Sequence, residues 1–104
     1  MGILSILGIG NNKIKEALRS GAIIIDVRTA HEFDEGKVPG SVNIPVDRIQ
    51  ANVERIRQMP RAVIVGGPSD DRNYKAVTIL KANGLEEVYN GGSWTRVIRL
   101  LKSL

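Results

Sequence analysis

Two kinds of hydrophobic pattern alternate along the chain. Uninterrupted runs of aliphatic, mostly β-branched residues predict strands that are covered on both faces, as in a parallel sheet. Ala22–Val27 and Ala62–Val65 are two such runs, and Ser41–Ile44 and Glu87–Tyr89 indicate two shorter strands. Between these runs, apolar residues recur every three or four positions, which is typical of helices with one buried face.

Four longer helices are expected before, between and after the strands. Their apolar positions are Ile14, Ala17 and Leu18 in the first, Ile49, Val53 and Ile56 in the next, then Ala76, Val77 and Leu80, and finally Trp94, Val97, Ile98 and Leu101. Residues that favour helix ends flank them: Asn11 or Asn12, Gly21, Asp47 and Asn83-Gly84. In addition, Thr29 and Glu32 have the spacing of a capping box, which predicts a short helix after the first strand.

This order of elements predicts an α/β fold with a central, mainly parallel sheet and helices on both faces. The 104 residues are enough for one domain, which we place at residues 11–104. Residues 1–10 form a short apolar segment that lacks the features of a signal peptide and is too short to span a membrane, so a cytoplasmic protein is expected. In parallel α/β sheets, ligands bind at the carboxyl ends of the strands.

The absence of cysteine excludes several kinds of chemistry. With no cysteine, the chain forms no disulfide, offers no thiolate to a metal and has no cysteine nucleophile. There is also only one histidine, and no phosphate-binding or dinucleotide-binding glycine pattern surrounds Gly66-Gly67 or Gly91-Gly92. The sequence therefore predicts neither a metal site nor a cofactor.

The net charge of +4 arises mainly from dispersed basic residues. Arg96, Arg99 and Lys102 are the densest group, and their spacing places them along one side of the last helix, where we interpret them as a solvated face. The aromatic residues are too few and too scattered to stack on bases, so nucleic acid is not an expected partner. One alternative places the last helix on a membrane surface through its apolar stripe, which burial of Trp94 against the sheet would exclude.

Three stretches resemble the motifs of the rhodanese family of sulfurtransferases. Asp26–Phe33 followed by Glu35–Pro45 is similar to the family signature of a DVR strand end, an EF helix and a G-H-I-P-G-A-x-N-I-P segment. Val63–Arg72 is similar to its active-site strand and loop, and Val88–Trp94 to its closing V-Y-N-G-G-x-W motif. The resemblance extends from about Ile14 to Leu101 and implies a rhodanese-like sheet of four or five strands, with the active site in the loop after the Val63 strand.

The resemblance also implies that the catalytic residue is missing. The family loop has the pattern C-x-x-x-x-R, and alignment on the strand and on Arg72 puts Gly67 at the position of the cysteine. Pro68 removes one amide from the expected anion cradle. Asp70 and Asp71 would each repel an anion at ~4 Å by about 1 kcal/mol in water. The candidate active-site loop thus comprises Gly66, Gly67, Pro68, Ser69, Asp70, Asp71 and Arg72.

Other residues of catalytic type have structural explanations. Ser69 would need a base to act as a nucleophile, and His31 is expected on a separate surface helix. Ser69, Asp70 or Asp71 is instead expected to cap the helix that follows the loop. The resemblance implies that Asp26 and Arg28 brace the end of the first strand, while Glu32 serves the capping box. Lys37 stands where the family usually has histidine, which leaves no proton-transfer group there.

The sequence therefore favours a catalytically inactive rhodanese-like domain that acts as a binding or regulatory module. Its partner, an unidentified protein or a small anion, is expected at the Gly66–Arg72 loop. The alternative is a divergent or variant sulfurtransferase acting on thiosulfate or a persulfide. A turnover assay with thiosulfate and cyanide distinguishes the two hypotheses.

Overall fold

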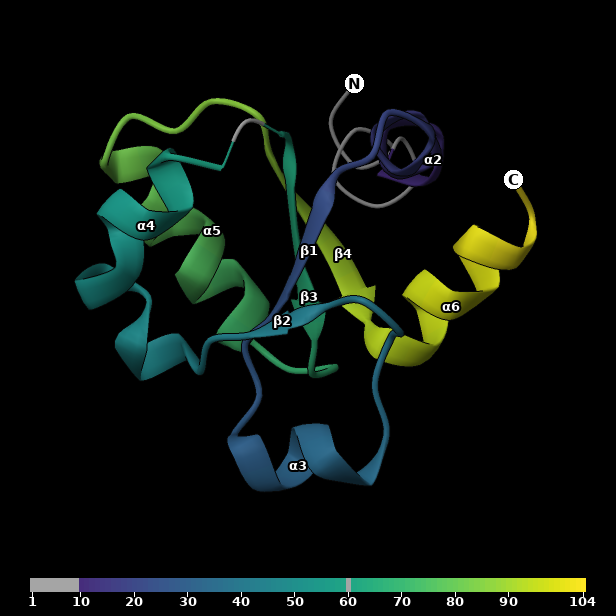
Figure 1. Ribbon diagram of the computed structural model, residues 1–104, viewed down its shortest axis with the longest axis horizontal. Helices are drawn as coiled ribbons and strands as arrows, with labels where there is room; N and C mark the ends of the chain where they lie inside the picture. Colours follow the sequence, from purple (N-terminus) through teal and green to yellow (C-terminus); the bar gives the residue numbers. More distant parts are fainter. Residues whose placement is uncertain (1–9, 60) are drawn as a thin grey trace.

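The computed structural model describes residues 10–59 and 61–104, and four parallel strands form its sheet (Figure 1). The strands pair in the order β2-β1-β3-β4. Their bounds are Ile23–Asp26 for β1, Val42–Asn43 for β2, Val63–Gly67 for β3 and Val88–Ser93 for β4. All four strands run in the same direction, so their carboxyl ends meet at one edge of the molecule, which is the lower edge in Figure 1.

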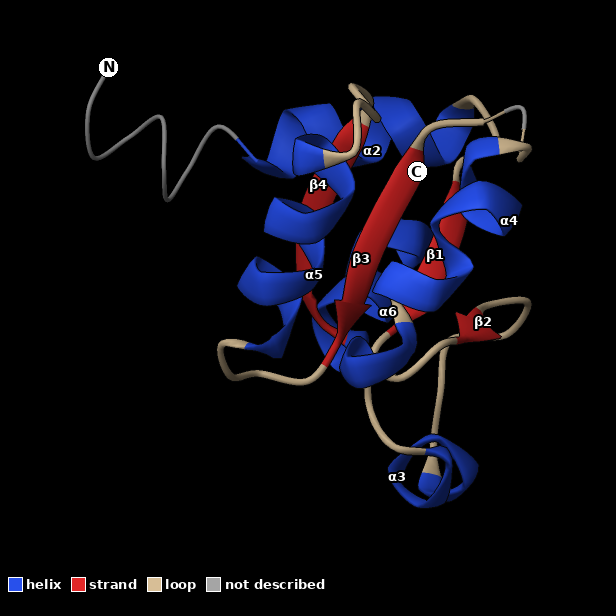
Figure 2. Cartoon of the chain, turned by 90° about the vertical axis from the view of Figure 1, so that its left-hand side faces the viewer, coloured by secondary structure: helices blue, strands red, loops and turns tan. Residues whose placement is uncertain are grey.

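Helices cover both faces of the sheet (Figures 1 and 2). Helices α2 (Gly10–Arg19) and α6 (Trp94–Lys102) cover one face, and α4 (Val53–Arg57) and α5 (Arg72–Ala82) cover the other. The short helix α3 (Ala30–Glu35) lies beyond the carboxyl ends of the strands. This arrangement confirms the predicted α/β fold with a parallel sheet.

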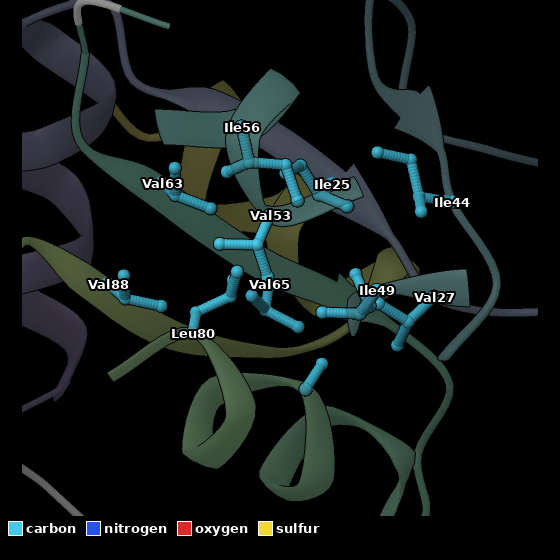
Figure 3. Close-up of a cluster of buried hydrophobic side chains, with 11 residues drawn as sticks. Ile25, Val27, Ile44, Ile49, Val53, Ile56, Val63, Val65, Leu80 and Val88 are labelled. Atoms are coloured by element: carbon cyan, nitrogen blue, oxygen red, sulfur yellow. The ribbon is translucent and has the colours of Figure 1, made fainter. Parts of the chain in front are cut away.

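Successive side chains of the two central strands, β1 and β3, point to opposite faces of the sheet and so contribute to two separate parts of the core. Ile25 and Val65 point toward α4 and α5, whereas Ile24 and Ile64 point toward α2 and α6. The larger half is shown in Figure 3, where side chains of the sheet meet Val53, Ile56 and Leu80 of the covering helices. Each fully buried aliphatic side chain of this kind stabilises the fold by about 1.5–3 kcal/mol.

The predicted last strand was too short. A turn was expected at Asn90-Gly91-Gly92, but β4 continues through these residues to Ser93. Pairing with β3 is maintained by a β-bulge: Val65 is opposite Asn90, the next residue, Gly66, is opposite Gly92, and Gly91 is the extra residue. Gly91 allows the close approach, since a Cβ there would lie 2.6 Å from Cγ2 of Ile64. The strand therefore ends at Ser93, immediately before α6, and the Ser93 hydroxyl caps this helix by accepting a hydrogen bond from the backbone amide of Arg96.

Two helix predictions also need correction. The helix expected after Asp47 is divided into two 3-10 turns, Val46–Arg48 and Gln50–Asn52, and the five-residue α4. Asn52 leaves the helical region and its side-chain amide donates to the carbonyl of Arg48, which separates the segments. Helix α2 already begins at Gly10, so Asn11 and Asn12 lie inside it and do not cap it. The apolar segment predicted at the N-terminus falls almost entirely outside the described residues.

Candidate functional site

An open cleft of about 370 Å³ lies at the carboxyl ends of the strands. It is bordered by the loop after β3, by the start of α6 and by side chains from the β1–α3 region. Its lining residues are Arg28, Glu32, Gly67, Pro68, Ser69, Asp70, Arg72, Ser93, Trp94 and Thr95. The structure therefore brings most of the residues selected from the sequence to one place.

Gly67, at the position aligned with the family cysteine, has no room for a side chain. It is the last residue of β3 and has φ = +112°, a conformation that residues other than glycine rarely adopt. A Cβ at this position would overlap Oδ1 of Asp26 and lie 2.8 Å from Oδ2. The Asp26 carboxylate thus occupies the space into which a nucleophile would project.

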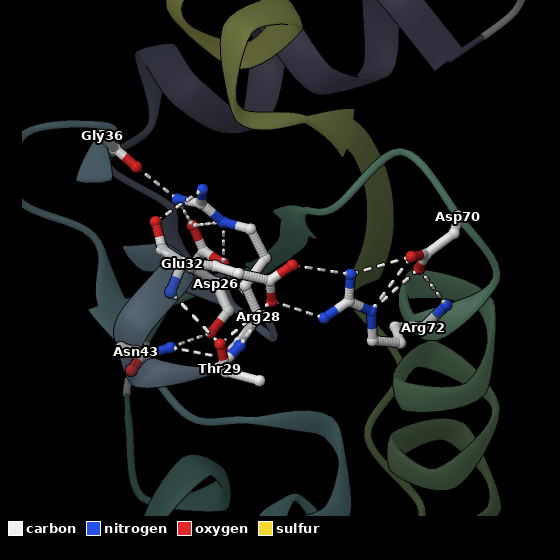
Figure 4. A network of polar contacts seen from close by, with 8 residues as sticks. All are labelled: Asp26, Arg28, Thr29, Glu32, Gly36, Asn43, Asp70 and Arg72. Carbon is white, nitrogen blue, oxygen red and sulfur yellow. Dashed lines mark hydrogen bonds and ion pairs between the residues drawn. The ribbon is translucent and has the colours of Figure 1, made fainter. Parts of the chain in front are cut away.

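Asp26 is held there by Arg28 (Figure 4). Both residues are buried, with 1% and 7% of their surface exposed. The Arg28 guanidinium donates to both oxygens of Asp26, at 3.0–3.1 Å from Nε and 2.8 Å from Nη2, and the Arg28 amide donates to Oδ1 at 3.0 Å. Such bidentate, charge-assisted bonds fix the position of both groups.

The same guanidinium joins β1 to α3 and α6. Arg28 donates to the carbonyls of Glu32 and Gly36, and its Cζ lies 5.4 Å from the centroid of the Trp94 ring. Trp94 also lies against Gly36, where a Cβ would be 2.8 Å from Cη2. Because Trp94 packs inward on the sheet-facing cluster and under Arg28, the proposal that the apolar stripe of this helix lies in a membrane was wrong.

Arg72 connects the loop to α3 (Figure 4). Nη1 donates to Oε1 of Glu32 at 2.7 Å, and Nη2 donates to Oδ2 of Asp70 at 2.8 Å. Hydrogen bonds from Arg72 lower the pKa of the Glu32 carboxyl and the pKa of the Asp70 carboxyl to about 2 each, and the two carboxylates raise the pKa of Arg72. The Glu32 carboxylate also accepts hydrogen bonds from the amide and the hydroxyl of Thr29, and the amide of Glu32 donates to that hydroxyl, so the predicted capping box is confirmed.

These pKa shifts predict an acid-sensitive contact. Ordinary values of 4.5 for Glu32 and 3.8 for Asp70 apply in the unfolded chain, and both fall to about 2 in the fold. The stabilisation is therefore present above about pH 4.5 and is lost as the pH falls from there through 2. We expect Arg72→Gln to be less stable than the natural chain at pH 6, and the difference in unfolding free energy to shrink toward pH 2 in urea titrations.

An NMR titration of the carboxyl carbons supplies the direct readout. Glu32 and Asp70 should titrate near pH 2 in the natural chain and close to their ordinary values in Arg72→Gln. Titration of Glu32 near pH 4.5 in the natural chain would show that the contact with Arg72 does not form in solution.

Asn73 holds the rest of the loop in place. Its side-chain amide donates to the carbonyls of Pro68 and Gly92, so it connects the loop to the bulge of β4. The residue is only 2% exposed. Asn73 was not among the site residues expected from the sequence, although its spacing of three and four from Ala76 and Val77 places it on the buried face of α5.

The loop also shows which candidate caps the helix. Asp70 accepts a hydrogen bond from the amide of Arg72 at 3.1 Å, whereas Asp71 at the cap position makes no such bond through its side chain. The Asp71 carboxylate instead lies 3.5 Å from Nζ of Lys75.

His31 lies away from the cleft loop. Its side chain is 86% exposed and lies beside Glu35, with 3.5 Å between Nε2 of His31 and Oε2 of Glu35. No hydrogen bond among the described residues joins it to Ser69.

The cleft therefore offers charge and hydrogen-bonding groups but no activated nucleophile. Three carboxylates, Asp26, Glu32 and Asp70, surround two guanidiniums, Arg28 and Arg72, so the local formal charge is −1. A larger hollow of about 620 Å³ lies at the opposite, amino ends of the strands. Its border mixes Lys13, Arg61, Glu16 and Glu87 with no convergent set of catalytic type. Among the described residues, no group of three or more histidine, aspartate or glutamate side chains is arranged so that it could hold a metal ion, and no helix is long and apolar enough to cross a bilayer.

Comparison with known proteins places this geometry in context. The chain is 33% identical over 79 residues to the uncharacterized protein YqhL of Bacillus subtilis (strain 168). The aligned region covers 73% of this chain and 62% of YqhL. The chain thus spans less than two thirds of that relative's length.

Solved structures share the fold. The Alr3790 protein from Anabaena matches with a TM-score of 0.69 at 22% identity, over 86% of this chain and 84% of that one. The human single-domain sulfurtransferase TSTD1 matches with a TM-score of 0.66 at 20% identity, over 85% and 91%. Residues 11–96 also match the sequence profile of the family described as Rhodanese-like domain. That match includes both central strands and the whole cleft loop, and the chain belongs to the rhodanese-like domain family.

Proposed function

We propose that this chain is a catalytically inactive rhodanese-like domain that acts as a binding or regulatory module through the cleft at the Gly66–Arg72 loop. One observation carries the proposal: the residue aligned with the nucleophile is a glycine with positive φ, and Asp26 fills the space beside it. Sulfur transfer through a persulfide requires a thiolate at that point. An unactivated Ser69 does not replace it, because an unassisted hydroxyl is a weak nucleophile.

The charges around the cleft favour a protein partner over a small anion. Arg72 already donates to Glu32 and Asp70, and Arg28 already donates to Asp26, so both guanidiniums are neutralised by neighbouring carboxylates. A small anion would add repulsion from the remaining carboxylate charge. A protein surface that presents hydrogen-bond donors or a basic side chain meets complementary groups there.

A sulfur-transfer assay tests the absence of catalysis. With thiosulfate as donor and cyanide as acceptor, we expect thiocyanate to form at the rate of the protein-free control. A single-domain sulfurtransferase that retains its cysteine serves as the positive control. Turnover by this chain above background would contradict the proposal and support the alternative of a divergent sulfurtransferase.

A photo-crosslinking experiment tests the location of the binding surface. A photoreactive amino acid is placed at Ser69, which is exposed on the cleft loop, and in a second variant at Glu86, which is exposed before β4 at the opposite end of the strands. We expect a specific cross-linked partner from the Ser69 variant alone. Cross-links that form only from Glu86 would place the partner elsewhere and overturn the assignment to the cleft.

A further inference from the structure

The segment of residues 29–37, which includes α3, stands apart from the rest of the molecule. Figures 1 and 2 show it beyond the carboxyl ends of the strands, joined to the body by two lengths of loop. None of its residues is buried, whereas the residues that flank it, Arg28 and Val38, are only 7% and 1% exposed. We use the term flap for residues 29–37.

The flap contributes no side chain to the core. Phe33 is its only large apolar residue, and it belongs to neither buried cluster. The centroid of the Phe33 ring instead lies 4.7 Å from Nζ of Lys37, which is itself part of the flap. A segment without buried apolar contacts opens locally at a lower free energy than the core does.

The flap is nevertheless a structured unit on a fixed base. The capping box holds α3 together from within. At one end of the flap, the side-chain amide of Asn43 donates to the carbonyl of Arg28 at 2.9 Å. At the other end, the hydroxyl of Ser41 donates to the carbonyl of Val38 at 2.6 Å. Any opening is therefore confined to the flap, which would turn about the residues next to these two anchors.

Three side chains of the body hold the flap in place. Arg28 donates to the carbonyls of Glu32 and Gly36, and the ring of Trp94 lies against Gly36. The third is Arg72, whose Nη1 and Nη2 donate to the two carboxylate oxygens of Glu32 at 2.7 and 3.2 Å (Figure 4). Among the described residues, no other hydrogen bond or ion pair joins the flap to the loop after β3.

The contact between Arg72 and Glu32 can break without disturbing the core. Their side chains are 24% and 38% exposed, and ion pairs that are open to solvent are weak and screened by salt. When the pair separates, Glu32 becomes hydrated and Arg72 keeps its bonds to Asp70. Neither charge is then left buried without a partner.

The closed flap covers part of Trp94. This residue is partly buried, and a Cβ on Gly36 would be 2.8 Å from Cη2 of the ring, so the backbone of Gly36 lies directly against the ring edge. Trp94 lines the cleft together with Ser93 and Thr95. Tryptophan is among the residues that contribute most to protein–protein binding when a partner packs on the ring.

We propose that the flap is a gate: the Arg72–Glu32 contact closes it over Trp94, and a protein partner gains full access to the cleft only when this contact opens. The role of the partner rests on the proposed function, whereas the opening itself is a property of the isolated chain. A partner that binds the open form shifts the equilibrium toward that form by its difference in affinity.

Fluorescence quenching tests the gate in the natural chain. Trp94 is the only tryptophan, so its emission reports on this site alone. Acrylamide is an uncharged quencher and can be used at any ionic strength. We expect quenching of Trp94 to increase as salt is raised from about 0.01 M to about 1 M, because salt screens the contact that closes the flap. Quenching that does not change with salt would overturn the proposal.

E32Q tests the contact directly. Glutamine is compatible with the capping box but removes the charge that Arg72 binds. NMR relaxation dispersion at the indole N–H of Trp94 measures the population of the open flap. We expect this population to rise about two- to fivefold in E32Q, the range for an ion pair that is partly exposed, and acrylamide quenching to increase with it. E32Q/R72Q should open the flap no further than E32Q, because both substitutions remove one contact.

E35Q is the matched control, because it makes the same substitution in the same helix at a carboxylate that lies beside His31 and does not contact the body. It should leave the population and the quenching unchanged, and amides of β3 should show no exchange in any variant. Equal effects of E32Q and E35Q, or no effect of E32Q, would overturn the proposal. These measurements use no partner, so failure of the cleft to bind one would appear separately, in the photo-crosslinking experiment.

Discussion

Replacement of Gly67 by alanine is expected to lower the free energy of unfolding by about 3 kcal/mol or more. Two effects add. The backbone at φ = +112° is strained for any residue with a Cβ, and that Cβ would overlap the carboxylate of Asp26, which is itself fixed by Arg28. Either the strand end or the buried ion pair must move. Urea denaturation at neutral pH measures the loss.

Gly40→Ala is the control that separates the two effects. Gly40 also has a positive φ, of +84°, but no atom lies within 4 Å of a Cβ built there. Its replacement should therefore cost only the backbone strain, about 1 kcal/mol. Equal losses for the two alanine variants would show that Asp26 does not fill the space beside Gly67 in solution.

The same clash bears on attempts to restore catalysis. We expect Gly67→Cys to transfer no sulfur from thiosulfate to cyanide, because the new side chain meets Asp26 and Pro68 still withholds an amide from the loop. A negative neighbour also raises the pKa of a thiol, which opposes formation of the thiolate. A stable Gly67→Cys variant with a low thiol pKa and measurable turnover would contradict this expectation.

Most of the fold was predictable because its signals are local. The runs at Ala22–Val27 and Ala62–Val65 became the two central strands, and the capping box at Thr29 and Glu32 formed as its spacing indicates. The bulge at Asn90–Gly92 was not predictable from turn chemistry. A positive φ was expected at the Gly91-Gly92 pair and is present at Gly92, but the close approach of Gly91 to Ile64 depends on the neighbouring strand.

Most residues of the candidate site could be selected from the sequence, but the contacts between them could not be predicted. Alignment with the family motif placed Gly67 and Arg72 at the loop, yet no sequence pattern shows that Asp26 fills the space beside Gly67. Likewise, Arg72 is 40 residues from Glu32 in sequence, and the pair forms only because α3 is carried to the start of α5. Contacts between distant segments depend on the packed sheet, and one sequence without its fold does not specify them.

Arg28→Met is expected to lower the free energy of unfolding by about 3–5 kcal/mol, the usual loss when one partner of a buried ion pair is removed. Asp26 would remain buried with its charge unpaired, and the carbonyls of Glu32 and Gly36 would lose their donor. Methionine keeps much of the apolar volume beside Trp94, so the loss reports mainly on the polar contacts.

Arg57→Met provides the comparison, because its partner Glu54 is exposed and such pairs contribute about 0–1 kcal/mol. Arg28→Lys should recover only part of the stability. The planar guanidinium of Arg28 donates to both oxygens of Asp26 and to two carbonyls, and the three N–H groups of a lysine ammonium cannot reproduce all of these bonds. If Arg28→Met lost no more than Arg57→Met, the guanidinium would not organise this end of the sheet. If Arg28→Lys matched the natural chain, charge alone would be sufficient and the bidentate geometry would be incidental.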